Sequence, residues 1–458
     1  MVERLTYDDD LFLRMECVLG VPVVNQIVWR FDSAVPLDAL ESMWQLLATG
    51  PLDRSVRRSA VPGARDGWIT ARTPAAPVVI GHAIARDGID LWIENEAAVT
   101  LDPIDGPAWR LSATSVDGGG TVVSLIGSHV VGDGGALTSA AAAALAGRAT
   151  PDDFVRGGLD HVPPRSSVRA DIADGVGQIG AALSGVARAL GRTAVDAVRS
   201  RTSSDEVAAG PTAPGPTPSR ALAVTAAREG KWVPSTVVVD CASGDWAAAA
   251  ASRGGSSNSL LVAVVLGILT ASGRVGPQDR VRVALPVSTR TPGDSRANAT
   301  SGVSIHVDGG QGYRDDLTAI RASSKQAFTD QADSTVTSVF ELLKPLMQVL
   351  PDVVVAKLAA SGSAPLCLCS NLGDRGARLR TIGGVDAAAV AMRSITQNTD
   401  VALLRRTAGG VSAWWNDSGD RATLCVTGLD PDAFPSKEHL RGLVEAEYTN
   451  WGLTAEFW

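Results

Sequence analysis

A segment rich in proline, glycine and serine divides the sequence and limits what the chain can fold into. Residues 203–219 read Ser-Ser-Asp-Glu-Val-Ala-Ala-Gly-Pro-Thr-Ala-Pro-Gly-Pro-Thr-Pro-Ser, a composition typical of flexible linkers. The chain of 458 residues is long enough for two or three domains. We therefore predict a linker at 203–219 between an N-terminal subdomain, 1–202, and a C-terminal subdomain, 220–458.

Both halves alternate short strands with helices. In the first half, the apolar spacing predicts helices at 34–49 and 136–146. Strands are expected there at 77–81, 89–94, 108–116 and 121–129, the last two joined by the hairpin signature Asp117-Gly-Gly-Gly120. In the second half we expect strands at 235–241, 280–286, 302–307, 365–370, 388–392, 401–404, 410–415 and 423–427, and helices at 259–272, 315–331, 337–350 and 437–450. This pattern predicts an α/β (α+β) fold with a site in the cleft between the halves.

One further predicted helix, at 171–201, is amphipathic. Its apolar residues form a single stripe: Ile172, Val176, Ile179, Leu183, Val186 and Leu190. We interpret it as a helix that lies on the protein's own core. The alternative, a helix on a membrane surface, is disfavoured because the polar face is not densely basic.

Composition and charge exclude several classes of protein. The net charge is −8, so no nucleic-acid-binding basic face is expected. The longest apolar run, 260–271, falls short of the roughly 20 residues that cross a bilayer, and the acidic start is unlike a secretory signal. The cysteines, odd in number and at no zinc-like spacing, indicate a reducing compartment: Cys17, Cys241, Cys367, Cys369 and Cys425. We expect a cytoplasmic protein without a metal site or a transmembrane segment, and leave open a peripheral contact at the inner membrane face.

A histidine motif stands at the end of the predicted buried strand 121–129. It reads His129-Val130-Val131-Gly132-Asp133-Gly134-Gly135 and precedes the alanine-rich helix. A strand end holds an imidazole rigidly, and a near-neutral imidazole can take a proton from a hydroxyl or amine and return it to a leaving group. Gly134 and Gly135 would let a substrate approach the backbone closely. The alternative is a core histidine, with Asp133 as the N-cap of the helix.

Further short motifs accompany this histidine along the chain. They are, in order, Leu5 to Phe12, Pro107-Ala108-Trp109, Asn258-Ser259, Pro286-Val287-Ser288-Thr289-Arg290, Ala297-Asn298 and Ser370-Asn371-Leu372-Gly373. Together they resemble the CoA-dependent acyltransferase superfamily, which includes peptide-synthetase condensation domains and chloramphenicol acetyltransferase. The chain looks most like its bacterial wax ester synthase/diacylglycerol acyltransferase branch and the polyketide-associated acyltransferases of actinobacteria. Ser128 stands in place of the first histidine of the His-His-x-x-x-Asp-Gly signature, and Ala108 and Ser259 replace a leucine and an aspartate.

The resemblance implies a fold and a reaction. The fold is two chloramphenicol-acetyltransferase-like subdomains, each a mixed sheet with flanking helices, with an active-site tunnel between them. The reaction is transfer of an acyl group from a thioester to a hydroxyl acceptor, with His129 as general base and no covalent intermediate. Acyl-CoA is then a co-substrate, and no other cofactor is expected. Formation of wax esters or diacylglycerol-derived lipids, or O-acylation of a natural product, is the implied use.

The motif residues also receive expected roles. In the superfamily the aspartate at Asp133 faces away from the cleft into an ion pair with an arginine, and Arg290 is the candidate here. Our candidate donors to the developing oxyanion are the backbone N–H groups near Gly134 and the strand end Ser370-Asn371. Trp414 and Trp415 are expected in the core and at its rim, or alternatively in an acyl tunnel. The other matched residues are expected to be structural: Pro107, Trp109, Asn258, Arg290 and Asn298.

Two other functions stay open. A related enzyme would take its acyl group from an acyl carrier protein and form an ester or an amide. A non-catalytic member of the fold would bind a lipid or a partner, and the serine at Ser128 is the feature that favours it. The expected partners are therefore acyl-CoA, a hydroxylated small molecule or lipid and, in the second case, a carrier protein.

Overall fold

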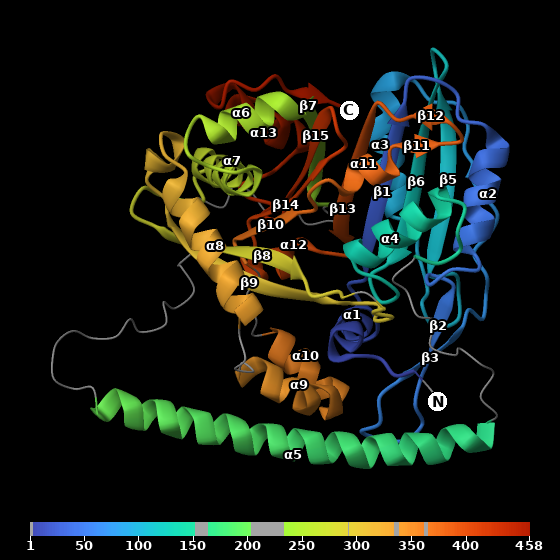
Figure 1. The fold of residues 1–458 in the computed structure, drawn as a ribbon, viewed down its shortest axis with the longest axis vertical. Helices are drawn as coiled ribbons and strands as arrows, with labels where there is room; N and C mark the ends of the chain where they lie inside the picture. The colour runs from blue at the N-terminus through green and yellow to red at the C-terminus, as the bar shows by residue number, and fades with distance from the viewer. Residues whose placement is uncertain (1–2, 152–163, 203–232, 292, 334–338, 361–364) are drawn as a thin grey trace.

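The computed structural model describes residues 3–151, 164–202, 233–291, 293–333, 339–360 and 365–458. The predicted linker at 203–219 lies outside these residues. The described chain forms two lobes side by side, each built on a sheet, and a long helix, α5 (Pro164–Thr202), lies across one end of both (Figure 1).

The first lobe is built on a five-stranded sheet of order β13-β1-β6-β5-β4. The strands are β13 (Ala389–Thr396), β1 (Val23–Phe31), β6 (Gly120–Ser128), β5 (Trp109–Val116) and β4 (Val79–Ile80). Helices α2 (Leu37–Leu47) and α4 (Gly134–Leu145) pack on one face, and α3 (Ile89–Ala97) packs on the other. The predicted hairpin is confirmed, since β5 and β6 pair antiparallel and Gly118 and Gly119 take the positive φ angles of the turn.

The second lobe is built on a seven-stranded sheet of order β16-β7-β15-β14-β10-β8-β9. The strands are β16 (Glu456–Phe457), β7 (Ser235–Ala242), β15 (Arg421–Gly428), β14 (Val411–Asp417), β10 (Cys367–Asn371), β8 (Arg280–Ser288) and β9 (Thr300–Asp308). Helices α6 (Ser243–Ala251), α7 (Ser257–Ala271) and α13 (Lys437–Asn450) pack on it, and α7 is buried over most of its length. The predicted fold class, two subdomains of mixed sheet with flanking helices, is confirmed.

One strand of the second half belongs to the sheet of the first lobe. β13 pairs antiparallel with β1, with Val23 opposite Thr396 and Arg30 opposite Ala389. The chain therefore crosses back to the first lobe after β10, and β13 contacts β14 and β15 of the other sheet (Figure 1). The division into 1–202 and 220–458 stays a prediction. The structure shows in addition that β13, from the second of these segments, pairs with β1 of the first.

The remaining elements surround the two sheets. They are α1 (Tyr7–Cys17), β2 (Arg54–Arg57), β3 (Gly67–Thr70), η1 (Arg86–Gly88), η2 (Gln311–Arg314), α8 (Thr318–Asp333), α9 (Val339–Val349), α10 (Asp352–Ala360), α11 (Arg375–Leu379), β11 (Thr381–Ile382), β12 (Val385–Asp386) and α12 (Val401–Thr407). Two predicted strands are wrong, because 89–94 lies in α3 and 401–404 lies in α12. In α3 the buried residues recur every four positions, as on one face of a helix, and in α12 the carboxylate of Asp400 accepts a hydrogen bond from the N–H of Leu403 and starts the helix.

The amphipathic helix predicted at 171–201 forms within α5, but the expected packing of its apolar stripe on the core is wrong. Small residues form the buried face instead: Gly175, Ala182, Gly185 and Ala189. The backbones of α5 and α9 approach so closely that a Cβ on Gly185 would lie 2.0 Å from the carbonyl oxygen of Leu342, so a large side chain does not fit there. No described helix, α5 included, combines the length and the hydropathy needed to cross a bilayer.

Candidate active site

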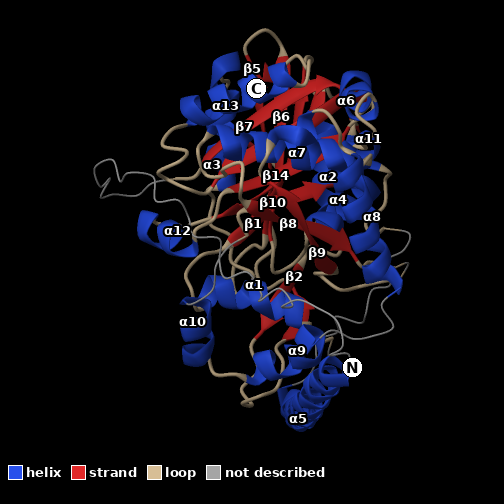
Figure 2. Cartoon of the chain, turned by 90° about the vertical axis from the view of Figure 1, so that its left-hand side faces the viewer, coloured by secondary structure: helices blue, strands red, loops and turns tan. Residues whose placement is uncertain are grey.

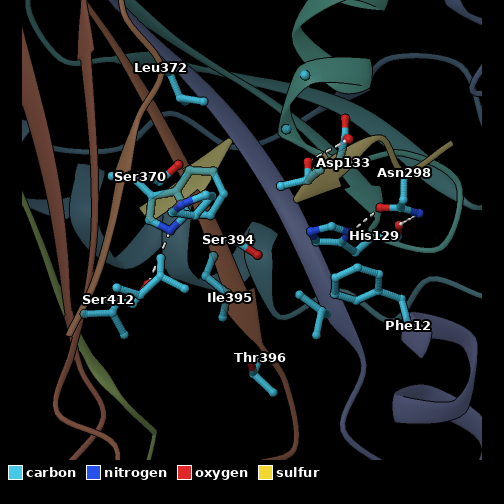
Figure 3. A pocket seen from close by; sticks show the side chains of 18 of the residues that line it. Phe12, His129, Asp133, Asn298, Ser370, Leu372, Ser394, Ile395, Thr396 and Ser412 are labelled. Atoms are coloured by element: carbon cyan, nitrogen blue, oxygen red, sulfur yellow. Dashed lines mark hydrogen bonds between the residues drawn. The ribbon is translucent and has the colours of Figure 1, made fainter. Parts of the chain in front are cut away.

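A cavity of about 460 Å³ lies between the two lobes (Figure 3). This volume falls within the range of small-molecule binding sites. Its walls come from α1, the turn between β6 and α4, the ends of β8 and β10, and strands β13 and β14. The predicted catalytic and substrate-binding residues all line it, together with Asn298: His129, Asp133, Gly134, Gly135, Ser370 and Asn371.

His129 stands directly after β6, where the strand leaves the sheet. Its backbone N–H still donates to the carbonyl of Val23 in β1 at 2.8 Å, so the sheet holds the residue in place. The imidazole is half-buried and stacks on the ring of Phe12 from α1, with centroids 3.6 Å apart and ring planes 18° apart. The sheet thus holds the backbone of His129, and Phe12 of α1 restrains the plane of its ring by stacking on it (Figure 3).

Asn298 determines which nitrogen of His129 carries the proton. The Asn298 side-chain nitrogen donates to the carboxylate of Asp9 at 2.9 Å and to the backbone carbonyl of His129 at 3.0 Å. Its side-chain oxygen is therefore the atom that lies 2.9 Å from His129 Nδ1, and Nδ1 must donate to it. Nε2 is left with its lone pair, and Figure 3 shows this second nitrogen turned toward the cavity. Asp9 therefore orients Asn298, and Asn298 orients the imidazole of His129, as further polar groups orient the base in many enzymes.

Burial lowers the pKa of His129 below its ordinary value, and the nearby Asp133 carboxylate offsets this only in part. Neutral imidazole is the form that can accept a proton. We therefore predict that the acid limb of kcat/KM, for a reaction in which His129 is the base, is centred below pH 6.5, because burial disfavours the protonated imidazole. A pH profile of kcat/KM on the purified protein checks this. An acid limb centred above pH 6.5 would contradict it.

Asp133 shapes the loop rather than offering its carboxylate to the cavity. One oxygen accepts from the N–H of Ala136 at 2.7 Å, as an N-cap of α4, and from Arg290 Nη2 at 3.1 Å. The other accepts from the N–H of Ala299 and the hydroxyl of Thr300 at 2.8 and 2.9 Å. Burial opposes ionisation, but the Arg290 guanidinium and the two N–H donors together hold the pKa of Asp133 below its ordinary value. The predicted ion pair with Arg290 is present in the structure.

The start of α4 forms one wall of the cavity. Gly134 and Gly135 are its first residues, and the first N–H groups of a helix have no partner within it. A Cβ on Gly134 would lie 3.3 Å from the ring of Trp414, so glycine allows these walls to approach. Trp415 is buried in the second-lobe core, and Trp414 is partly buried against a neighbouring core cluster and lines the cavity, so the expected placement in the core and at its rim is confirmed. The acyl tunnel stays a prediction.

The strand end of β10 lies across the cavity from this turn. The Asn371 side-chain oxygen accepts from the N–H of Gly373 at 2.8 Å, so it stabilises its own turn. Ser370 lines the cavity, as do Ser394, Thr396 and Ser412, which also carry hydroxyl groups (Figure 3). Of the two predicted residues, Ser370 is therefore the better placed to donate to a ligand.

Of the other motif residues, Pro107, Trp109, Asn258 and Arg290 are not part of the cavity wall, whereas Asn298 is. Trp109 is buried in the core of the first lobe, and Pro107 precedes it at the start of β5. Asn258 lies in the first turn of α7, where Ser256 and Ser259 form a capping box. Arg290 and Asn298 lie on the segment between β8 and β9 that reaches over to the histidine turn.

Sequence reasoning missed several residues of the cavity wall. Phe12, Arg375, Ser394 and Thr396 all line it. Phe12 closes the opening motif that starts at Leu5, and this match was the available signal for it. No local pattern marks the others. Within the described ranges, no group of three or more His, Cys, Asp or Glu side chains is arranged to hold a metal ion.

The arrangement of two mixed α/β lobes is similar to the fold of condensation domains. The chain is similar to the first condensation domain of the calcium-dependent antibiotic synthetase, solved with a substrate analogue, with a TM-score of 0.55, 14% identity, and 98% of this chain and 95% of that chain covered. It is also similar to the wax ester synthase/diacylglycerol acyltransferase from Marinobacter aquaeolei VT8, with a TM-score of 0.55, 11% identity and coverage of 98% and 100%.

A third similar structure is that of polyketide synthase associated protein 5 from Mycobacterium tuberculosis, with a TM-score of 0.51, 14% identity and 97% of each chain covered. No family model and no curated protein matches the sequence. The predicted resemblance to the condensation-domain-like acyltransferase superfamily is confirmed at the level of the fold.

Proposed function

We propose that the protein is an acyltransferase that moves an acyl group from a thioester to a hydroxyl acceptor. The observation that carries the proposal is the state of His129, whose proton is held on Nδ1 by Asn298 while Nε2 faces the cavity. An imidazole in this state is a ready general base. The similar folds of condensation domains and a wax ester synthase support a transferase in general.

The reaction needs one base and no covalent intermediate on the protein. Nε2 of His129 takes the proton of the acceptor hydroxyl while its oxygen attacks the thioester carbonyl carbon. The new C–O bond forms, the tetrahedral intermediate collapses, the C–S bond breaks, and the imidazolium returns the proton to the departing thiolate. The products are an ester and a free thiol. A positioned general base contributes about 10²–10⁴-fold to such a step.

The tetrahedral intermediate carries an oxyanion that needs donors. The N–H groups of Gly134 and Gly135 stand at the positive end of α4, and the Ser370 hydroxyl lies in the same cavity. We assign the oxyanion to this side of the cavity. Donors fixed by a helix and a strand need no reorganisation during the reaction, which is the source of their effect.

Arg375 indicates the chemistry of the donor. Two other charged residues of the described wall are paired, Asp8 with Lys344 at 3.2 Å and Asp133 with Arg290 at 3.1 Å. Within the part of the chain that the structure describes, Arg375 lines the cavity with no hydrogen-bond or ion-pair partner. A guanidinium in this position suits a phosphate of CoA or of a phosphopantetheine arm.

We predict that Arg375→Ala raises the KM of the acyl-CoA donor about tenfold and leaves the KM of the acceptor unchanged, because one charge-assisted hydrogen bond is lost. Steady-state kinetics check this, with Arg375→Lys as the variant that keeps the charge. An acyl thioester of N-acetylcysteamine has no phosphate and is the matched control donor, whose KM is expected to be the same in both proteins. A donor KM that does not change for acyl-CoA would refute the assignment.

A panel of donors and acceptors tests the proposed function. The full chain is incubated with acyl-CoA of graded chain length, or with the same acyl groups on a carrier protein, plus an alcohol or an amine, and the free thiol is trapped. Thiol release from acyl-CoA that requires the alcohol supports O-acyl transfer. A preference for carrier-bound donors or amines would support the alternative, a carrier-dependent condensation enzyme, which the likeness to synthetase condensation domains favours.

The serine in place of the first motif histidine does not argue for a non-catalytic protein. Ser128 is 2% exposed, and its hydroxyl accepts from the N–H of Val130 at 3.3 Å. It is not part of the cavity wall, whereas His129 is. The first motif position is therefore structural in this chain, and the catalytic proposal does not need a histidine there.

A further inference from the structure

The long helix α5 presents large apolar side chains to water. Val168, Ile172, Val176, Ile179 and Leu183 are each between 48% and 69% exposed. They follow one another at spacings of three and four residues, so they form one continuous line, which we call the apolar stripe. A contiguous exposed apolar surface of this kind marks an interaction site in soluble proteins.

The apolar stripe is not the face by which α5 packs on the protein. That face consists of small residues, and the near contact of Gly185 with the Leu342 carbonyl shows how close it lies. Two carboxylates of the helix anchor it further. Asp171 pairs with Arg4 and Arg57 at 2.6 and 2.7 Å, and Asp174 pairs with Arg65 at 2.7 Å. The helix is thus held with its large side chains outward.

The charges of the helix indicate what covers the stripe. Between 168 and 190 the only carboxylates are Asp171 and Asp174, and both are occupied by the protein's own arginines. The exposed charged side chains of this stretch are Arg169 and Arg188. The polar face is not densely basic, but the structure shows that the apolar side chains between these arginines are exposed and that both carboxylates are paired. Such a surface complements a bilayer that contains anionic lipids.

The position of α5 fits such a surface. The helix runs nearly straight across one end of the molecule, and Figure 2 shows it end-on below both lobes. α9 packs between α5 and α1, and Lys344 of α9 pairs with Asp8 of α1. Because α1 forms a wall of the cavity, through Leu11, Phe12 and Met15, the apolar stripe and this apolar wall lie at the same end of the molecule.

We propose that α5 docks on the surface of an anionic bilayer, with the apolar stripe in the interface and the helix parallel to the membrane plane. The interaction is peripheral, since the polar and packed faces of the helix stay with the protein. It goes beyond the proposed acyl transfer and does not depend on it.

The test is binding of the full chain to vesicles of phosphatidylcholine with about one third phosphatidylglycerol, measured by cosedimentation. The variant replaces Ile172, Val176 and Leu183 with serine, and the matched control replaces three other exposed apolar residues, Leu37, Ile80 and Leu91 of the first lobe, with serine. We expect the α5 variant to lose at least about tenfold in vesicle partitioning and the control to bind like the wild type. Vesicles of phosphatidylcholine alone should bind the wild type more weakly.

Circular dichroism and thioester turnover with a water-soluble donor show whether the variants are folded. A wild-type protein that does not bind either vesicle, or an α5 variant that binds as well as the control, overturns the proposal. So does a wild-type dimer that the α5 variant converts to a monomer without any vesicle binding, because the stripe then covers a second copy of the chain. If the α5 variant loses vesicle binding but keeps its thioester turnover, the result supports the docking proposal and does not contradict the proposed acyl transfer.

Discussion

His129→Ala is expected to lower kcat for thioester-dependent acyl transfer by about 10²–10⁴-fold, the usual contribution of a positioned general base. The reason is geometric. The ring lies in the cavity wall, its plane is fixed by Phe12, and its free nitrogen is fixed by Asn298. Donor and acceptor KM should change little, because the imidazole does its work on a proton that moves in the transition state. Steady-state kinetics with a free-thiol readout measure both.

Two variants separate loss of the base from loss of the fold. Added imidazole should restore part of the activity of His129→Ala, since it can occupy the space that the ring leaves and supply the same nitrogen. Asn298→Ala keeps the imidazole but removes the group that fixes its tautomer, so a smaller loss is expected, with the acid limb of the pH profile displaced. Full activity of His129→Ala would show that His129 is not the general base.

Asp133→Ala is expected to cost about 3–5 kcal/mol of stability, because breaking one partner out of a buried ion pair leaves the other charge uncompensated. Arg290 would face the place of a lost carboxylate, and the N–H of Ala299 and of Ala136 would lose their acceptors. The first turn of α4 and the segment between β8 and β9 are then no longer joined. Denaturant unfolding of the full chain, followed by fluorescence, measures the change.

The same carboxylate predicts a pH dependence. The pKa of Asp133 is held below its ordinary value of 3.8 in the folded protein, so its contribution is fully present above that pH and is lost as the pH falls through the lower folded value. Asp133→Ala should therefore be destabilised relative to the wild type at neutral pH, and the difference should shrink in strong acid. Asp133→Asn keeps the shape of the side chain and loses its charge, so its stability at neutral pH should lie between those of the wild type and Asp133→Ala. Equal stability of all three proteins at pH 7 would show that the ion pair contributes nothing.

Some elements of the fold can be predicted from the sequence and others cannot. The helix predicted at 437–450 forms as α13 because a serine N-cap, Ser436, precedes the buried residues Leu440, Val444 and Tyr448 at helical spacing. β1 was not predicted because Asn25 and Gln26 interrupt the apolar pattern. Both are buried, and their amides bond to the Gly132 carbonyl and the Ser124 hydroxyl, partners that a single strand does not reveal.

The sequence also does not reveal which distant strands pair or which face of α5 packs on the protein. Nothing local indicates that β13, from the second half, pairs with β1. In α5 the periodicity predicts the helix correctly, but a period does not say which face meets the protein. The sequence holds small residues on one face and large apolar residues beside it, and only the close approach of α9 shows that the small face is the packed one.

The candidate site was predictable where one motif contains it. His129, Asp133, Gly134 and Gly135 are neighbours in sequence and meet in one turn. The residues that give the histidine its state come from far away, since Asp9 and Asn298 lie 289 positions apart and bond at 2.9 Å. Asn298 was expected to be only structural, and its role in fixing the tautomer needs coordinates to be seen.

The central claim is that acyl transfer is direct, with His129 as base and no acyl group on the protein. Free thiol and acylated acceptor measured together with the intact mass of the protein during the first turnover test it most directly. We predict thiol and acylated acceptor in equal amounts, release that requires the acceptor, and an unchanged protein mass. Thiol release without acceptor, accompanied by a protein heavier by one acyl group, would contradict the account.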